Sequence, residues 1–167
     1  MSMKLRTATP EDADALGDFA ARVFSENFGH LYKPEDLAAH LVKSCSACFF
    51  TDCMKQDTVL LAMDGEYIAG YTKVGAVGLP VRPHPENSGE IHRLYIDVPY
   101  QGRGVGHMLM KAALQLPILA QSSHIYLGVW ENNHRAQAMY RSYGFAPVGE
   151  YLYYVGDHAD REIIMMR

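Results

Sequence analysis

Runs of apolar and alternating residues along the chain predict the strands and helices of a mixed α/β domain. Strand-like runs occur at residues 4–7, 59–62, 67–74, 91–98, 125–130, 146–155 and 162–166. Apolar residues at helical spacing predict helices that begin near residues 11, 34, 105 and 133. The first of these extends to about residue 24 and the last to residue 143. This order predicts a mixed sheet with one parallel crossover, between the strands at 91–98 and 125–130.

Punctuating residues mark the ends of these elements. Thr9-Pro10-Glu11-Asp12 and Lys33-Pro34-Glu35-Asp36 are typical helix starts, with a proline in the first turn and acids that favour the helix dipole. Asp64-Gly65 predicts a hairpin turn, and Pro117 should kink or end the third helix. The proline-rich stretch 78–89 predicts a loop. The apolar face of the second helix is expected to contain Leu37, Leu41 and Val42.

The composition is that of one globular domain. The 167 residues are 49% hydrophobic and 20% charged, with a formal net charge of -4. This acidic balance argues against unspecific nucleic-acid binding and favours a cationic partner. The start lacks an apolar segment of signal-peptide length, and no run approaches the ~18 apolar residues of a membrane span. We therefore expect a single domain over residues 1–167, in the cytoplasm, with neither nucleic acid nor membrane as partner.

The three cysteines suit a reducing compartment. Cys45, Cys48 and Cys53 are an odd number of thiols, which does not favour a disulfide framework. Together with His40 they could imitate a zinc site, but the spacing lacks a second pair of ligands. Because the surrounding segment is apolar, we expect buried free thiols and no metal.

The turn Gln101-Gly102-Arg103-Gly104-Val105-Gly106 lies between a strand and a helix and predicts an anion site. Glycines let backbone N–H groups approach an anion, and the helix start adds its positive dipole end. His107 and Met108 stand where a P-loop needs lysine and a hydroxyl residue, which excludes that motif. The dinucleotide fingerprint fits weakly, because His107 occupies the place of its third glycine. A turn without any ligand remains the alternative at this point.

Two motifs together resemble the GNAT superfamily of acetyl-CoA-dependent N-acetyltransferases. The first is Gln101-x-Arg103-Gly104-x-Gly106 after a strand. The second is Asn133-x-x-Ala136-x-x-x-Tyr140-x-x-x-Gly144-Phe145, about thirty residues later. The resemblance covers nearly the whole chain in element order. It implies the GNAT fold, in which about four helices flank a twisted mixed sheet of six to seven strands that splay apart at the cofactor site.

Three further stretches look like the PaiA-like polyamine acetyltransferases, which act on spermidine or spermine. They are residues 24–37, with Phe28-Gly29-His30-Leu31-Tyr32, the phrase Leu127-Gly128-Val129-Trp130-Glu131, and the tail from Gly156 to Met165. The tail departs from the expected pattern at Glu162, where an aspartate is expected. The acceptor suggested by this narrower resemblance is a polyamine or another small amine.

The GNAT resemblance implies which residues hold coenzyme A. The pyrophosphate would lie on the backbone N–H groups of the glycine turn, and the pantetheine arm would pair like an added strand with the strand before it. Asn133 would bond the cofactor, cap its own helix, or do both. The expected cofactor-binding residues are Leu94, Tyr95, Ile96, Gln101, Gly102, Arg103, Gly104, Val105, Gly106, Asn133 and Tyr140.

The same resemblance suggests the catalytic residues. Tyr140 stands where these enzymes place the general acid that protonates the departing thiolate, and the N–H of Leu94 would stabilise the oxyanion. Glu90 stands eleven residues before Gln101, the offset of the general base in related histone acetyltransferases. His92 shares its strand face and could relay the proton or replace Glu90. Simple packing or solvent exposure is the alternative for Glu90 and His92.

Aromatic residues at two places are candidates for the acceptor site. Tyr151 and Tyr153 alternate onto one face of a late strand, where their rings and acids such as Asp157 could hold an alkylammonium group. Core packing is the alternative for both tyrosines. The connection between the first two helices offers three more candidates, Phe28, Tyr32 and Glu35.

The sequence therefore predicts an N-acetyltransferase that moves the acetyl group of acetyl-CoA to a primary amine by direct attack in a ternary complex. The leading acceptor is a polyamine or other small amine, and the rival is a peptide N-terminus or a protein lysine. A non-catalytic acetyl-CoA-binding regulator is the alternative of another class. A homodimer is possible. The acceptor, its reacting nitrogen and the choice of base remain open.

Overall fold

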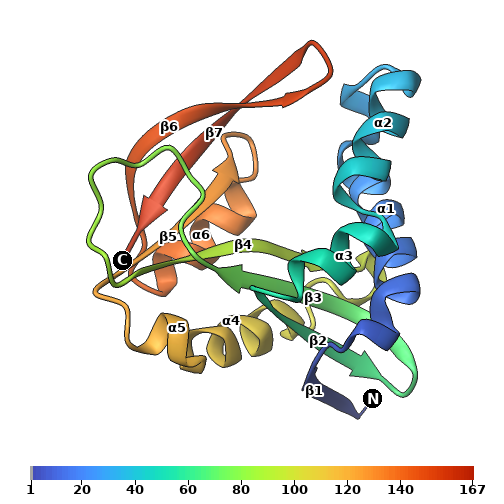
Figure 1. The fold of residues 1–167 in the computed structure, drawn as a ribbon, viewed down its shortest axis with the longest axis horizontal. Coiled ribbons are helices and arrows are strands. Elements are labelled where there is room, and N and C mark those ends of the chain that lie inside the picture. Colours follow the sequence, from blue (N-terminus) through green and yellow to red (C-terminus); the bar gives the residue numbers. More distant parts are fainter. Residues whose placement is uncertain (1) are drawn as a thin grey trace.

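A computed structural model describes residues 2–167 as a seven-stranded mixed sheet with helices on both faces (Figure 1). The strand order is β1-β2-β3-β4-β5-β7-β6. The strands are β1 (Met3–Thr7), β2 (Thr58–Asp64), β3 (Tyr67–Gly75), β4 (Ser88–Ile96), β5 (His124–Trp130), β6 (Ala146–Val155) and β7 (His158–Met166). The helices are α1 (Ala13–Phe28), α2 (Pro34–Ser44), α3 (Ala47–Cys53), α4 (Val105–Gln115), α5 (Pro117–Ala120) and α6 (His134–Ser142).

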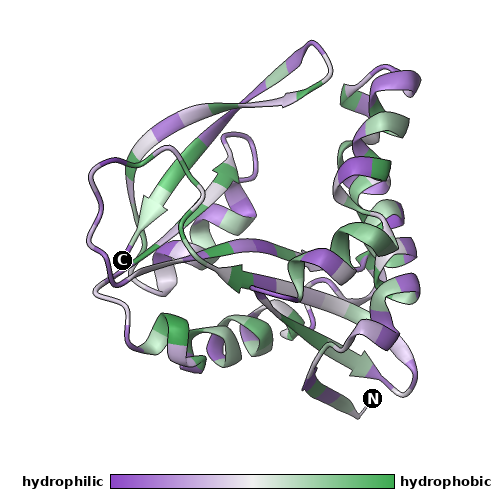
Figure 2. Ribbon diagram, in the orientation of Figure 1, coloured by the Kyte–Doolittle hydropathy of each residue, from purple (hydrophilic) through white to green (hydrophobic). Residues whose placement is uncertain are grey.

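The sheet separates two hydrophobic cores. Residues of α1 and α3 pack on one face, around the fully buried Tyr71 of β3. Residues of α4, α5 and α6 pack on the other face, around Leu109 and Leu127. Helices α4 and α5 are largely apolar, in keeping with this burial (Figure 2). Both layers meet β4, so groups on its two faces belong to different cores.

Strands β4 and β5 form the parallel pair that the sequence predicts, and they separate early. Their register runs from Ser88 opposite His124 to Ile91 opposite Leu127 and goes no further. Beyond that point β4 continues alongside β3 alone, and β5 continues alongside β7. Within residues 2–167, no strand therefore pairs with the edge of residues 92–96 that faces β5. This confirms the splayed pair that the GNAT resemblance implies.

An irregularity in the pairing of β3 with β4 places two β4 residues that are three positions apart in the same core. The register with β3 shifts between Lys73 and Val74, so that His92 has no direct partner. As a result Ile91 and Leu94 both pack in the α4–α6 core, although they are three residues apart.

The last hairpin projects beyond the sheet toward α2 (Figure 1). The turn of this hairpin lies so close to α2 that a Cβ on Gly156 would come within 2.2 Å of the carboxyl carbon of Asp36. The Tyr153 hydroxyl lies 3.2 Å from His40 Nε2. The C-terminal hairpin and the N-terminal helices thereby enclose space between them.

Several elements differ from the expectation. The sequence analysis missed α3, although Ser46 caps it by accepting a 3.1 Å hydrogen bond from the N–H of Phe49. Val42 is 74% exposed and was wrongly placed on the apolar face of α2. Cys45 is buried, but Cys48 is exposed, so the expectation of three buried thiols was wrong. Strand β7 begins four residues earlier than expected.

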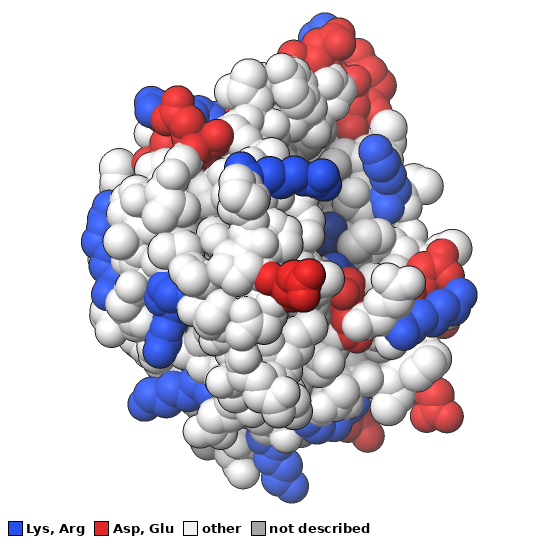
Figure 3. Space-filling model, turned by 60° about the vertical axis from the view of Figure 1, so that its left-hand side comes forward, with Lys and Arg blue, Asp and Glu red and all other residues white. Residues whose placement is uncertain are grey.

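Charged residues are scattered over the surface. Figure 3 shows one face, on which basic and acidic side chains alternate without a broad patch of one sign. Acidic side chains gather at the top of this view, the end at which Figure 1 draws the β6–β7 turn and the start of α2. Among residues 2–167, no helix is both long and apolar enough to cross a membrane.

Candidate active site

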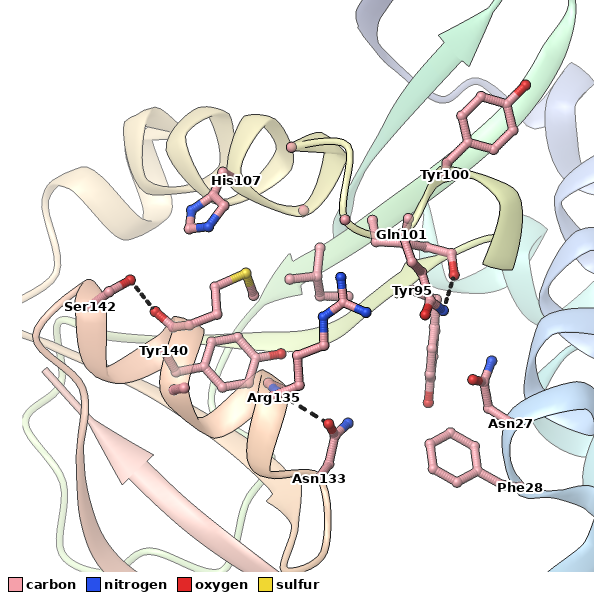
Figure 4. Close-up of a pocket in the computed structure, with 18 residues that line it drawn as sticks. Asn27, Phe28, Tyr95, Tyr100, Gln101, His107, Asn133, Arg135, Tyr140 and Ser142 are labelled. Carbon is pink, nitrogen blue, oxygen red and sulfur yellow. Dashed lines mark hydrogen bonds between the residues drawn. The ribbon is translucent and has the colours of Figure 1, made fainter.

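A cavity of about 600 Å³ lies where β4 leaves β5, between the glycine turn and α6 (Figure 4). Leu94, Tyr95 and Ile96 form its wall on β4. The opposite wall is α6, and Asn27 and Phe28 at the end of α1 contribute the remaining side. An extended ligand with amide groups could pair here with the free edge of β4.

The glycine turn has the conformation that an anion cradle requires. Gly102 and Gly104 have φ angles of 75° and 84°, a region that costs other residues about 1–2 kcal/mol. Gly104 is the N-cap of α4, so the first N–H groups of this helix have no partner within it. Arg135 of α6 reaches toward the turn, within 3.4 Å of the position of a Cβ on Gly102. The site thus combines a helix start with a nearby cation.

Tyr140 of α6 directs its hydroxyl into this cavity (Figure 4). The residue is only 7% exposed, and its ring packs edge-on against Phe145. Burial, and next the neighbouring Tyr95 and Glu162, raises the pKa of Tyr140 well above its ordinary value. The phenol therefore holds its proton at neutral pH, as a proton donor must.

A second, smaller cavity of about 160 Å³ adjoins the first. The two share Phe28 and Tyr95 in their walls. The second cavity lies between the N-terminal helices and the C-terminal hairpin, and its other lining residues are Phe24, Tyr32, Glu90, His92, Arg93, Gly128, Trp130, Tyr151, Tyr153, Asp160 and Glu162. Aromatic rings and carboxylates predominate, which suits an organic cation.

The three carboxylates of this second cavity have different partners. Asp160 uses both oxygens, accepting hydrogen bonds from the Tyr32 hydroxyl at 2.6 Å and from His158 Nε2 at 3.0 Å. Glu90 uses Oε2, which accepts the N–H groups of Gly78 at 2.6 Å and Leu79 at 3.1 Å. The side chain of Glu162 forms no hydrogen bond within residues 2–167. Burial, and next the charge of Asp160, raises the pKa of Glu162 to about 7.

The ring of His92 is held at both nitrogens. Its Nε2 lies 2.7 Å from the carbonyl oxygen of Ala76, to which it donates, and Nδ1 lies 2.7 Å from Lys73 Nζ, from which it accepts. Lys73 also pairs with Asp57 at 2.8 Å. These contacts leave His92 no free lone pair for a substrate proton. These contacts therefore argue against His92 as a relay for the substrate proton.

The tyrosines of the second cavity are neutral. Burial raises the pKa of Tyr32, Tyr151 and Tyr153 above the ordinary value, and the charge of Glu162 is the next cause for Tyr151. The Tyr151 hydroxyl lies directly over Gly128, where a Cβ would come within 2.7 Å of it. Uncharged rings with nearby carboxylates can hold an ammonium group by cation–π and charge contacts.

Comparison with known proteins identifies the family. Residues 19–145, which include both walls of the larger cavity, match the model of the acetyltransferase (GNAT) family. The chain belongs to the GNAT acetyltransferase family. GNAT acetyltransferases use acetyl-CoA, and the predictions of enzyme class and cofactor are thereby confirmed.

Relatives and solved structures agree with this GNAT assignment. An uncharacterized N-acetyltransferase of Lactobacillus delbrueckii subsp. lactis is 26% identical, over 99% of this chain and 96% of its own length. The spermine/spermidine N(1)-acetyltransferase of Bacillus subtilis is 32% identical over 59% of this chain and 65% of its own. PaiA N-acetyltransferase of Thermoplasma acidophilum, solved with coenzyme A, is similar in fold, with a TM-score of 0.79, 18% identity, and coverage of 100% of this chain and 99% of that one.

The larger cavity of this GNAT enzyme collects most of the residues expected to bind the cofactor. Its lining includes Leu94, Tyr95, Ile96, Gln101, Gly102, Gly104, Gly106, Asn133 and Tyr140. Asn133 caps α6, because its Oδ1 accepts a 3.1 Å hydrogen bond from the N–H of Ala136. The side-chain NH₂ group of Asn133 takes no part in this cap. Arg103 is exposed and Val105 is buried in the core, and neither lines the cavity. The free edge of β4 and the volume of the cavity fit a coenzyme with an extended amide arm.

The smaller cavity collects four of the five expected acceptor residues, together with Glu90 and His92. Phe28, Tyr32, Tyr151 and Tyr153 all line it. Glu35 is exposed and lies outside its lining, as does Asp157, which the sequence analysis considered as a nearby acid.

Sequence reasoning missed other residues of both cavities. Arg135 lies within the second GNAT motif, two residues after Asn133, and its position in that motif was an available signal. His107 lines the larger cavity and bonds the Tyr143 hydroxyl at 2.9 Å. Asp160 and Glu162 lie on β7 and reach the smaller cavity only because β7 pairs between β5 and β6. Glu162 lies in the tail from Gly156 to Met165 that looks like the PaiA-like enzymes, which was an available signal, whereas no motif quoted from the sequence singles out Asp160.

Proposed function

We propose that this GNAT N-acetyltransferase transfers the acetyl group directly to a primary amine of a small cationic acceptor, with a polyamine as the leading class. The observation that carries the proposal is the contact between two cavities. One fits coenzyme A, and the other is lined by carboxylates and aromatic rings and shares the walls Phe28 and Tyr95 with the first. An amine in the second cavity lies next to the donor site.

The chemistry of the smaller cavity supports a slender cationic acceptor. Its volume of about 160 Å³ is below the roughly 300–1,000 Å³ of ordinary drug-sized sites, which favours a linear alkylamine over a bulky acceptor. Glu90, Asp160 and Glu162 supply negative charge, and the rings of Tyr151 and Trp130 supply faces for cation–π contact. The similarity to the spermine/spermidine N(1)-acetyltransferase of Bacillus subtilis also supports this class.

Residues of the larger cavity hold the donor and assist departure of its thiolate. Acetyl-CoA supplies an acetyl thioester. The N–H groups at the start of α4 and the guanidinium of Arg135 bind its phosphates, and the free edge of β4 binds its arm. The N–H of Leu94 stabilises the oxyanion, and Tyr140 donates its proton to the thiolate.

An assay of thiol release tests this function. Purified protein and acetyl-CoA are incubated with spermidine, spermine, a short diamine, an amino acid, an aminoglycoside and a peptide with a free N-terminus. Thiol release without acceptor serves as the control for hydrolysis. We expect the highest kcat/KM with a polyamine or diamine, and a product heavier than the acceptor by one acetyl group.

Two outcomes would contradict the proposal. Turnover confined to the peptide would assign the acceptor to a peptide or protein amine. Binding of coenzyme A, measured by calorimetry, without thiol release for any amine would indicate a regulator that keeps the cradle and lacks turnover.

A further inference from the structure

Building on the proposed function, we propose that Glu162 of β7 accepts the proton that the acceptor's ammonium group loses before its nitrogen attacks. Every acceptor of this class carries this proton at neutral pH, because an alkylammonium has a pKa of ~10.4. A group next to the acceptor must therefore take it. Glu162 lines the smaller cavity and lies in the C-terminal tail from Gly156 to Met165, outside the two GNAT motifs.

Comparison of the three carboxylates in the cavity favours Glu162. Both oxygens of Asp160 already accept hydrogen bonds, one from the Tyr32 hydroxyl and one from His158. Glu90 is tied by Oε2 to the backbone of residues 78 and 79, so it anchors the loop before β4. Glu162 alone among the three has no hydrogen-bond partner within residues 2–167. Its side chain is free to contact a ligand.

The strand pairing places Glu162 beside two aromatic residues of the smaller cavity. It lies opposite Trp130 of β5 and opposite Tyr151 of β6, at the centre of the three C-terminal strands. Its charge is among the causes, after burial and Tyr95, that raise the pKa of Tyr140, the proposed acid of the larger cavity. Trp130 packs edge-on against Phe28, with 6.0 Å between the ring centres, and Phe28 lines both cavities. Glu162 therefore lies near the junction of the two cavities, where the acceptor nitrogen must meet the thioester.

The surroundings of Glu162 give its carboxyl group a pKa that suits a proton acceptor at neutral pH. Burial first, and then the negative charge of Asp160, raises its pKa from 4.5 to about 7. Such a carboxylate binds a proton roughly 300 times more tightly than an ordinary glutamate and is still largely ionised above pH 7. Besides Asp160, the other ionisable groups that line the cavity are Tyr32 beside α2, then Glu90, His92, Arg93 and Tyr95 on β4, and Tyr151 and Tyr153 on β6.

Arg93 does not neutralise Glu162 by pairing with it. Its Nη1 donates a 2.6 Å hydrogen bond to the carbonyl oxygen of Ser44, at the end of α2, and its guanidinium lies 4.6 Å from the centre of the Phe49 ring. Lys73 is likewise paired elsewhere, with Asp57 and His92. The cation that completes the environment of Glu162 is thus the acceptor itself.

The proton transfers balance without any further reactant. The ammonium gives one proton to the Glu162 carboxylate, and the free amine forms a C–N bond to the acetyl carbon. The C–S bond then breaks as Tyr140 protonates the sulfur, and the nitrogen passes its second proton to the Tyr140 phenolate, which restores the phenol. Glu162 returns its proton to water, which yields an acetylated amine, a thiol and one proton.

The pH dependence of kcat/KM for spermidine tests this role. We expect the wild type to gain activity through an apparent pKa near 7. Glu162→Gln, which keeps the shape and loses the carboxylate, should lower kcat/KM at pH 7 by about 100-fold or more. The loss should shrink as the pH approaches the pKa of the amine, where no base is needed. Glu162→Asp should recover part of the activity. Glu150→Gln, on the exposed face of β6, is the matched control.

The outcomes separate this inference from the proposed function. A Gln variant whose pH profile runs parallel to that of the wild type, or whose defect lies in KM alone, would overturn Glu162 as the proton acceptor while acetyl transfer stands. If the wild type transfers no acetyl group to any amine, the proposed function itself fails. Coenzyme A affinity and thermal stability of each variant, measured in parallel, show that a loss of rate is not a loss of folding.

Discussion

The hydroxyl of Tyr151 lies directly over Gly128, so close that a Cβ at position 128 would come within 2.7 Å of it. Tyr151 stands on β6 and Gly128 on β5, with β7 between them in the sheet. The absence of a side chain at 128 is what lets the ring reach across β7 into the acceptor cavity. The position of this ring therefore depends on a residue of another strand.

Gly128→Ala should displace the Tyr151 ring and impair acceptor binding. We expect KM for spermidine to rise about tenfold, because a cation–π contact at a partly desolvated site is worth roughly 1–2 kcal/mol. The Kd of coenzyme A should stay the same. Gly149→Ala is the control, since a Cβ there meets only Ile164, at an ordinary 3.8 Å. Equal effects of both substitutions would refute the role of Tyr151.

Tyr140→Phe removes the proposed acid and leaves the packing of α6 in place. We expect kcat to fall by about 10²–10⁴-fold with nearly unchanged affinity for coenzyme A, because the ring is buried and only its hydroxyl faces the cavity. Steady-state kinetics at saturating substrates, with calorimetric titration of coenzyme A, measures both quantities. Unchanged turnover would exclude Tyr140 as the proton donor.

Glu162 should make the stability of the protein depend on pH. Its folded pKa of about 7 exceeds the ordinary value of 4.5, so between these values the folded state binds more protons than the unfolded state. Stability from this group is therefore lost as the pH rises from about 4.5 to about 7. Glu162→Gln does not titrate and should have a Tm that exceeds the wild-type Tm by more at pH 8 than at pH 5. Thermal unfolding at a series of pH values measures this difference, and a constant offset would contradict the raised pKa.

Gly104→Ala should weaken coenzyme A binding by straining the start of α4. Its φ of 84° disfavours alanine by about 1–2 kcal/mol, so either the turn reshapes or the protein loses that stability. We expect the Kd of coenzyme A to rise at least tenfold. Gly144→Ala is a matched control, since Gly144 has a φ of 90°, open space around it, and a place outside the cavity lining. It should lower Tm similarly and spare the affinity. Equal affinities for the two variants would argue against the cradle.

The fold and the cofactor cavity were largely predictable because their signals are local. Helix starts, the hairpin and the glycine turn depend on neighbouring residues, and Gly104 and Asn133 act in the structure as helix caps where the sequence indicates helix starts. Helix α3 was missed although Ser46 is a usable cap signal. Val42 was misplaced because an apolar residue on a helix can remain exposed, and spacing alone does not show which face meets the core.

The acceptor cavity was only partly predictable because it depends on strand order. Tyr151 and Tyr153 were found by alternation, which is a local property. Glu162 and Asp160 reach the cavity because β7 inserts between β5 and β6, a choice of pairing that no local pattern encodes. The hydrogen bond from Tyr32 to Asp160 joins residues 128 positions apart. Such long-range partners determine which carboxylates already accept hydrogen bonds from the protein and which can contact a ligand.

A competition assay tests the central claim most directly. Limiting acetyl-CoA is added to an equimolar mixture of spermidine, a diamine, a peptide with a free N-terminus and a lysine-containing peptide, and the products are identified by mass spectrometry. Acetylated spermidine or diamine should dominate, and this preference should decline in the Gly128→Ala variant. A product mixture dominated by an acetylated peptide would contradict a small cationic amine as the acceptor of the acidic cavity.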